Sequence, residues 1–324
     1  MNCPEQSILF INPVFKQMLW GGSRLGEDWP YEIPGDDTGE CWAISAHPNG
    51  DCTIKGGKFD GYKLSTLWKE EPELFGNTGF DRFPLLVKII NAEDYSSIQV
   101  HPNDTYARAH ENGSFGKMEC WYILDSSEDS SLVVGHNADT RKELKSMVKK
   151  GEWKELIREV HVEKDDFIQI EPGTIHTFGG GLMILEIQQN SDITYRVYDF
   201  DRKTNGKPRE LHLDKALEVI SVPSKPLESY IKKTGNMPEN TMNLLIECYY
   251  YKVWKLDISK PITVKQDQPF MLMSVTRGEG TLNGTVIRKG DHFILPYGYG
   301  DISLEGNMQL IASTCNCPCG QSHA

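Results

Sequence analysis

The sequence predicts a mainly β protein made of two lobes of antiparallel strands with a small helical insert. Three observations support this fold class. Short runs rich in β-branched and aromatic residues alternate with Gly, Pro, Asn and Asp throughout the chain. Helical spacing of apolar residues dominates one region, between Thr140 and Val160. A stretch near the C-terminus repeats the pattern of an earlier stretch, and 324 residues are enough for two or three lobes.

In the first lobe, the alternation of apolar and polar residues predicts strands at 83–90, 97–101, 120–124, 131–134, 166–170 and 183–188. The helical insert is expected at about 139–160, with Asp139 or Thr140 as the N-cap and an interruption at Gly151. A second helix is expected at 213–220, after the polar stretch 201–210.

Residues 222–240 are rich in Pro, Ser and Lys and lack periodicity, so they are predicted to be a linker. Beyond it, strands are expected at 250–256, 270–276, 280–286 and 292–296. The run 288–296 resembles 163–173, which indicates an internal duplication. The first copy continues to His176, whereas the second offers Tyr297 and Tyr299 and no imidazole, so the second lobe is expected to keep the fold and to lack a metal site.

Composition excludes several classes of partner. The net charge of -12 disfavours nucleic acid and anionic membranes, and an anionic small ligand would need a local basic pocket. No apolar run is long enough to span a bilayer, and the N-terminus lacks a secretion signal, so a cytoplasmic protein is expected. Scattered cysteines are expected to be reduced thiols, and the cluster near the C-terminus is either a mobile tail or an adventitious or regulatory metal binder. The scattered cysteines are Cys3, Cys41, Cys52, Cys120 and Cys248, and the cluster is Cys315, Cys317 and Cys319.

Four ligand-type side chains in separate segments suggest one metal site. Gln99 and His101 alternate with apolar residues, so on a strand they share one face. Glu119 lies on a second alternating segment, and His176 follows a Pro-Gly turn. Amide, imidazole and carboxylate groups suit zinc, iron or manganese. The alternatives from the residues alone are an exposed polar strand face and a structural histidine.

The same segments carry a family resemblance. The run Pro172–Phe178 is similar to the second motif of cupins, which are jelly-roll β-barrels with a metal in the barrel mouth. Together with Gln99–Pro102, Gly116–Glu119 and Ser191–Arg196, it resembles type I mannose-6-phosphate isomerases of the short bacterial form. The resemblance implies two cupin-like jelly-roll β-barrels: a catalytic domain at 1–221 and a C-terminal domain at 241–324 that lacks the metal. It also implies one Zn²⁺ per chain, held by Gln99, His101, Glu119 and His176.

The family reaction interconverts mannose 6-phosphate and fructose 6-phosphate through a cis-enediol. It needs a cation at the developing oxyanion, a base that moves the proton and a cationic clamp for the phosphate. The resemblance makes Arg196 essential and Glu186 the first candidate for the base, with Asp192 as the other candidate for proton carrier or as a partner that orients Arg196. Lys117 should project into the same pocket, and Ser97 and Lys88 are candidates to line it.

Three points stay open from the sequence. The basic run 202–209 is either a phosphate-side lid or a solvated loop. The competing functions are a non-catalytic cupin that binds a sugar phosphate and a metal-dependent cupin oxygenase, although an oxygenase usually has more imidazole ligands. Either a monomer or a homodimer is compatible with the sequence.

Overall fold

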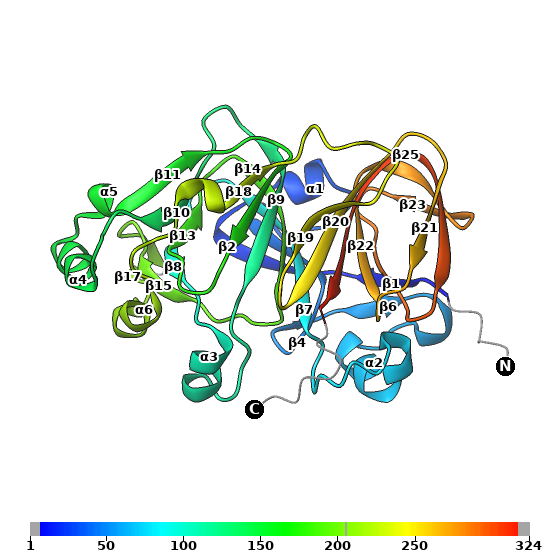
Figure 1. Cartoon of the computed structure of the whole chain (residues 1–324), viewed down its shortest axis with the longest axis horizontal. Helices are drawn as coiled ribbons and strands as arrows, with labels where there is room; N and C mark the ends of the chain where they lie inside the picture. Colours follow the sequence, from blue (N-terminus) through cyan, green and yellow to red (C-terminus); the bar gives the residue numbers. More distant parts are fainter. Residues whose placement is uncertain (1–6, 205, 317–324) are drawn as a thin grey trace.

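The computed structural model describes residues 7–204 and 206–316, and it confirms the mainly β fold. Three large antiparallel sheets form successive layers along the long axis of the molecule (Figure 1). The outer layer of the first lobe is a five-stranded sheet, the middle layer has seven strands, and the C-terminal lobe is a curled nine-stranded sheet. The helices lie at the periphery of these layers.

Each sheet joins strands that come from distant parts of the chain. In spatial order, the seven-stranded sheet contains β18 (Ile231–Lys233), β12 (Asp166–Ile170), β9 (Glu119–Ser126), β14 (Leu182–Gln189), β7 (Leu85–Ala92), β3 (Thr38–Ile44) and β2 (Val14–Gly22). The five-stranded sheet contains β11 (Ile157–His161), β10 (Ser131–His136), β13 (His176–Phe178), β8 (Ile98–Val100) and β15 (Tyr195–Tyr198). The nine-stranded sheet contains β19 (Asn243–Glu247), β20 (Tyr251–Ile258), β25 (Gly300–Cys315), β22 (Met271–Leu282), β24 (His292–Leu295), β1 (Leu9–Asn12) and β6 (Thr53–Lys55), with β21 (Ile262–Gln266) paired to β25 and β23 (Thr285–Arg288) paired to β22.

Short elements complete the described chain. The α-helices are α1 (Arg24–Glu27), α2 (Leu64–Glu70), α3 (Asp104–His110), α4 (Arg141–Lys150), α5 (Trp153–Leu156) and α6 (Leu213–Val219). The 3-10 helices are η1 (Gly57–Phe59), η2 (Pro72–Phe75) and η3 (Leu227–Ser229). Two small hairpins are β4 (Ala46–His47) with β5 (Gly50–Asp51), and β16 (Lys203–Thr204) with β17 (Lys207–Pro208).

The seven-stranded sheet is buried on both faces. Every residue of β7 and β14 is buried, which explains why these strands are nearly continuous apolar runs. One face packs on the C-terminal lobe, where Val87 and Leu185 belong to the same apolar cluster as Leu272. The other face packs on the five-stranded sheet through a second cluster that includes Trp121 and Phe178. The few charged side chains on this second face are therefore enclosed between two sheets.

The helical insert is shorter than expected. Helix α4 begins after Thr140, whose side chain accepts a hydrogen bond from the backbone N–H of Glu143, and it ends at Gly151 in the left-handed conformation. The expectation of helix up to Val160 was wrong, because residues 157–161 form the edge strand β11 and pair with β10. β-branched residues such as Ile157 and Val160 suit a strand when an adjacent edge is available.

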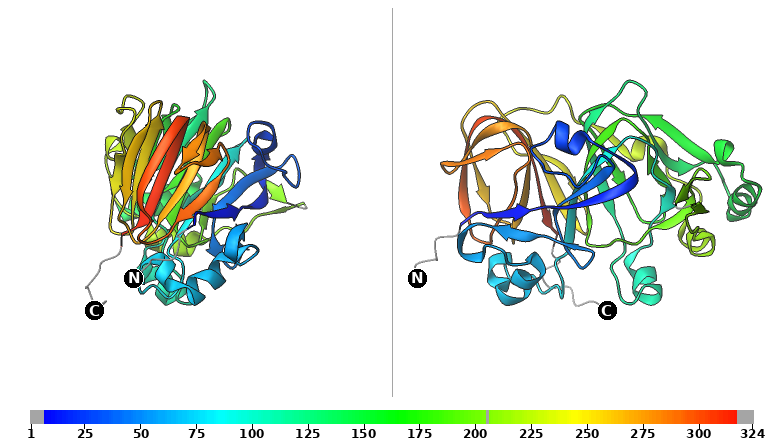
Figure 2. Two further views of the ribbon diagram at one scale, coloured as in Figure 1. Left: turned by 90° about the vertical axis from the view of Figure 1, so that its right-hand side faces the viewer. Right: turned by 180° about the vertical axis from the view of Figure 1, so that it is seen from behind.

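The two lobes are more interwoven than the sequence suggests. Strand β18 lies within the expected linker 222–240 and pairs with β12 of the first lobe. Strand β1, close to the N-terminus, pairs with β24 of the C-terminal lobe, as the rear view in Figure 2 shows. The proposed domain boundaries remain a prediction, but the N-terminal strands clearly contribute to the C-terminal sheet.

The two related segments, 163–173 and 288–296, begin with matching turns. The carboxylate of Asp166 accepts a hydrogen bond of 2.9 Å from the backbone N–H of Glu163. The carboxylate of Asp291 accepts one of the same length from Arg288. Each turn leads directly into a strand, β12 or β24, so the resemblance between the segments extends to their local geometry.

Thiols are consistent with the reduced state expected from the sequence. Cys41, Cys52, Cys120 and Cys248 are free. Cys315 belongs to β25 and is buried, whereas Cys3, Cys317 and Cys319 lie outside the described residues. Among the described residues, no helix is long and apolar enough to cross a membrane.

A cluster of four aromatic rings joins α2 and η2 to the C-terminal lobe. Phe270 is fully buried and lies 5.6 Å from Phe83 and 5.8 Å from Phe75, measured between ring centroids. We expect Phe270→Ala to lower the free energy of unfolding by about 3–5 kcal/mol, because a large cavity would open at a site that packs on both lobes. Denaturant unfolding measures this loss. Val286→Ala, which removes an exposed side chain, is the control and should change little.

Candidate metal centre

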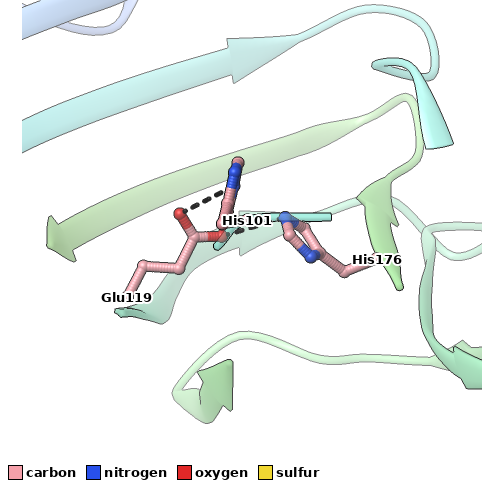
Figure 3. A group of neighbouring side chains, drawn as sticks. All are labelled: His101, Glu119 and His176. Carbon is pink, nitrogen blue, oxygen red and sulfur yellow. Dashed lines mark ion pairs between the residues drawn. The ribbon is translucent and has the colours of Figure 1, made fainter. Parts of the chain in front are cut away.

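His101, Glu119 and His176 meet between the two sheets of the first lobe. One ligand atom from each lies within 4.8 Å of the others, and the three side chains are essentially inaccessible to solvent. Figure 3 shows both imidazoles facing the carboxylate of Glu119. His176 Nε2 lies 3.2 Å from Glu119 Oε1, and His101 Nε2 lies 3.5 Å from Glu119 Oε2. Within the described chain, this is a group of donors that could hold a metal ion.

The backbone explains how these residues come together. Glu119 is the first residue of β9, and His176 is the first residue of β13. Gln99 in the centre of β8 is the direct cross-strand neighbour of His176. Gly173 donates its backbone N–H to the carbonyl of His101, which ties the turn before β13 to the end of β8.

Glycine is required at position 173. Its φ of +86° lies in the left-handed region, and an added Cβ would lie 2.4 Å from Ser221 Oγ and 2.8 Å from the carbonyl oxygen of Val219. Both the dihedral angle and the close packing therefore exclude a side chain there.

The donor set fits a divalent metal. The Nδ1 atom of His176 lies 2.9 Å from the carbonyl oxygen of Thr174, so an N–H at this position donates and leaves the Nε2 lone pair facing the cluster. Burial, together with the charge of Lys117, lowers the pKa of His101 to about 3 and keeps its imidazole neutral. Neutral imidazoles and a carboxylate are the forms in which these side chains bind zinc and similar metals.

Glu119 remains ionised in spite of its burial. Burial alone would raise its pKa, but the neighbouring charge of Lys117 outweighs burial and holds the pKa well below its usual range. Lys117 Nζ lies 2.7 Å from Glu119 Oε2 and 3.2 Å from His101 Nε2. Among the described residues, neither carboxylate oxygen of Glu119 has a hydrogen bond of good geometry. A buried carboxylate whose oxygens are free of such bonds is suited to a metal ion.

Gln99 reaches the cluster from β8. Its Nε2 atom lies 3.3 Å from His176 Nε2. Its side chain also lines a cavity of about 650 Å³ beside the cluster, which is called the metal-site cavity below. An amide ligates a metal through its oxygen, so Gln99 would have to present Oε1. The structure places Ser97, Lys88, Lys117, Glu186, Asp192 and Arg196 at the same cavity. All the predicted site residues are thus at this cavity or at the buried cluster beside it.

A buried charge network occupies the floor of the cavity. Lys88 Nζ lies 3.1 Å from Glu186 Oε1 and 3.6 Å from Glu40 Oε1. Two indoles complete it: Trp121 Nε1 donates to Glu186 Oε2 at 3.0 Å, and Trp42 Nε1 donates to Glu40 Oε2 at 2.6 Å. Burial would lower the pKa of Lys88, but Glu186 and Glu40 outweigh it and raise the pKa. The ammonium is therefore permanently charged between two carboxylates.

Arg196 and Arg209 line another wall of the cavity. Arg209 is engaged by a carboxylate, because its Nε donates to Asp199 Oδ2 at 2.7 Å. Arg196 donates instead to the neutral carbonyl of Glu210 at 2.8 Å, and its buried Nε has no hydrogen-bond partner among the described residues. Burial, and then the charge of Arg209, lowers the pKa of Arg196. An anion in the cavity would give Nε a hydrogen-bond partner, and its charge would stabilise the charged guanidinium.

Asp192 lies at the exposed rim, where the amide of Asn49 donates to its Oδ2 at 3.0 Å. Lys16 reaches the same loop and donates to the backbone carbonyl of Asn49. Its ammonium lies 5.1 Å from the centroid of the Trp42 ring. Lys16, Asn49 and Asp192 thus form a connected rim of the cavity.

Several cavity residues were not predicted from the sequence. Glu40 could have been predicted from the sequence, because it is the single charged residue in the largely apolar strand β3. Arg209 was predicted only as part of the basic run 202–209, which in the structure includes the hairpin β16–β17. Lys16 and Asn49 gave no signal, because they come from remote segments brought to the cavity by sheet pairing.

Comparison with known proteins extends these observations. Residues 8–122 match the family model of the type I phosphomannose isomerase catalytic domain, and residues 240–315 match that of the mannose-6-phosphate isomerase cupin domain. The chain is 49% identical to mannose-6-phosphate isomerase ManA of Bacillus subtilis, covering 94% of this chain and 98% of the relative. It is 41% identical to mannose-6-phosphate isomerase of Streptococcus mutans, covering 95% and 98%.

Solved structures agree with the sequence comparisons. The crystal structure of mannose 6-phosphate isomerase from Bacillus subtilis superimposes with a TM-score of 0.91 at 42% identity, covering 95% of this chain and all of that one. A putative mannosephosphate isomerase from Archaeoglobus fulgidus superimposes with a TM-score of 0.76 at 20% identity, covering 95% and 98%, which supports the fold alone. These matches cover both lobes.

Proposed function

The chain belongs to the type I phosphomannose isomerase family and is a mannose-6-phosphate isomerase, and on this premise we propose a zinc-dependent interconversion of mannose 6-phosphate and fructose 6-phosphate through a cis-enediol. One observation carries the proposal. A buried His-Glu-His cluster lies beside the cavity that also contains a buried carboxylate, Glu186, and a guanidinium without a carboxylate partner, Arg196. These are the three kinds of group that proton transfer next to a carbonyl in a sugar phosphate requires.

We propose that His101, Glu119 and His176 hold the metal, with the oxygen of Gln99 as the fourth protein ligand. A mixed set of imidazole, carboxylate and amide donors suits zinc when one position stays open for a substrate. When bound, the metal supplies Lewis-acid stabilisation of the negative charge that develops on oxygen during proton transfer. Lys117 contacts two of these ligands and lines the cavity, so its ammonium would orient them and add positive charge beside the substrate.

Glu186 is the better candidate for moving the proton between C1 and C2. Its side chain is 3% exposed, and Trp121 and Lys88 fix its orientation. Its Oε1 accepts no hydrogen bond from the described residues and approaches only Lys88. Asp192 lies at the exposed rim and is held by the amide of Asn49, so it is better placed to bind a hydroxyl group of the sugar.

The charges of the cavity support a position for the phosphate of the substrate. Lys88, Lys117 and Arg209 are each paired with a buried carboxylate. Lys16 and Arg196 are the cavity cations for which the described residues supply no carboxylate partner within ion-pair distance. A phosphate dianion would bind where positive charge is not yet compensated. We therefore propose that Arg196 binds it, or an enediolate oxygen, and that Lys16 assists at the rim.

Turnover in deuterated water tests the proposed function. The zinc-loaded protein should convert mannose 6-phosphate to fructose 6-phosphate, and NMR should detect any deuterium that enters at C1 or C2 during proton transfer. Chelation should abolish turnover, and zinc should restore it, because the charge on oxygen is no longer stabilised without the metal. His176→Ala should lose both bound zinc and turnover, with His161→Ala as a control on the exposed strand β11.

Two results would contradict the proposal. Binding of the sugar phosphate without conversion would indicate a non-catalytic protein, and full activity after the complete removal of metal would exclude the role assigned to His101, Glu119 and His176. The metal content is measured in the same samples by elemental analysis, so that loss of activity is compared directly with loss of zinc.

A further inference from the structure

A second cavity of about 440 Å³ lies where helix α3 and the chain before β7 meet the C-terminal lobe. It shares no lining residue with the metal-site cavity. Its volume falls within the roughly 300–1,000 Å³ that is usual for small-molecule sites. Residues from both lobes line it: Phe80, Asp81, Arg82, Asp104, Arg108 and Phe115 on one side, and Tyr249, Tyr250 and Asn316 on the other.

Aromatic rings form much of the wall of this cavity. Tyr249 is 57% exposed, which is unusual for a large ring, and it packs edge-on against Tyr250 at 5.1 Å between centroids. Phe115 belongs to the other lobe and is covered by the guanidinium of Arg82 at 5.0 Å. Exposed rings at a concave site offer flat apolar surface for a ligand face.

Charge distinguishes this cavity from the metal-site cavity. Two arginines and two aspartates line it, whereas five basic and three acidic side chains line the metal-site cavity. Arg82 lies 3.4 Å from Asp81, and Arg108 has no ion pair within the described chain. A balanced set of planar donors and acceptors beside aromatic rings suits an uncharged ligand with many hydroxyl groups better than a phosphate.

We propose that this cavity is a second binding site, and that its ligand is an uncharged mono- or disaccharide. The C–H face of a sugar ring would stack on Tyr249. Its hydroxyl groups would bond to Arg108, Asp81 and Asn316, whose side chains offer both donors and acceptors.

Hydrogen bonds connect the floor of this cavity to the metal ligands. Asp104 Oδ1 accepts from the backbone N–H of Gly116 at 2.7 Å and from Gln189 Nε2 at 3.0 Å. Gln189 Oε1 accepts from the backbone N–H of Met118 at 3.0 Å. Met118 lies between Lys117 and Glu119, so a ligand that displaces Asp104 or Gln189 also acts on the segment that carries the metal-binding carboxylate.

Calorimetric titration with D-mannose, D-glucose, maltose and cellobiose tests the proposal. The full chain is used with zinc, and mannose 6-phosphate is present at saturation to occupy the metal-site cavity. We expect saturable binding of at least one of these sugars with one site per chain. Tyr249→Ala and Arg108→Ala should each weaken it by about tenfold, because each removes one main contact. Tyr297→Ala removes a ring of similar exposure outside the cavity and should leave binding unchanged.

Two outcomes would overturn the proposal. One is that none of the four sugars binds saturably at millimolar concentration. The other is binding that Arg196→Ala abolishes and Tyr249→Ala does not, which would place the sugar in the metal-site cavity. Isomerase activity is measured on the same samples, so failure of the second site is distinguishable from failure of the proposed function.

Discussion

Replacing Arg196 with alanine is expected to lower kcat/KM for mannose 6-phosphate by about 10²–10³-fold while the zinc content stays unchanged. Arg196 is a cation of the metal-site cavity without a carboxylate partner among the described residues, and its buried Nε makes no hydrogen bond there. Its guanidinium does not approach His101, Glu119 or His176 within ion-pair or hydrogen-bond distance. The variant should therefore lose contact with the substrate and keep the metal.

Arg196→Lys separates charge from geometry. It keeps a positive charge and loses the planar group that makes two parallel hydrogen bonds, so we expect it to recover a small part of the activity. Arg158→Ala, which removes an arginine of the edge strand β11, is the control. Loss of zinc from Arg196→Ala, measured by elemental analysis, would contradict the role assigned to this residue.

Replacing Glu186 with glutamine is expected to lower kcat by about 10²–10⁴-fold, because the isosteric amide cannot accept the proton. Trp121 and Lys88 contact Glu186 on the floor of the cavity, so the amide should occupy nearly the same place. Deuterium exchange into the substrate is measured by NMR and should fall in parallel with turnover.

Asp192→Asn is the matched variant for this test. It makes the same chemical change on the other carboxylate of the cavity, and we expect it to raise KM more than it lowers kcat, because Asp192 lies at the rim. The reverse pattern, in which Asp192→Asn stops exchange and Glu186→Gln does not, would transfer the role of proton carrier to Asp192.

The metal cluster could be predicted because its members lie in short local patterns. Gln99 and His101 alternate on one segment, and His176 follows a Pro-Gly turn; the structure brings His101 and His176 together with Glu119. Alternation fixes which side chains share a face, and that information is local. The resemblance to a family then connected segments that lie far apart in the chain.

The remainder of the cavity depends on long-range pairing. Lys16 reaches it because β2 joins the edge of the seven-stranded sheet, and the partners of Lys88 are Glu40 on β3 and Glu186 on β14. One sequence does not specify which strands are neighbours, so neither the network nor the rim could be assembled from patterns. The pairing of β1 with β24 was missed for the same reason, since these strands are separated by most of the chain.

The middle sheet of the molecule has a further consequence for how the protein can be divided. Its strands β7 and β14 carry Lys88 and Glu186 on the face towards the metal-site cavity, and Val87 and Leu185 on the opposite face pack on the C-terminal lobe. A fragment without that lobe would expose a broad apolar surface directly behind Lys88 and Glu186, and such surfaces cause aggregation. The C-terminal lobe is therefore not expected to be a detachable module. It covers the apolar face of the lobe that contains the His-Glu-His cluster, so neither lobe is expected to be exchangeable between relatives on its own.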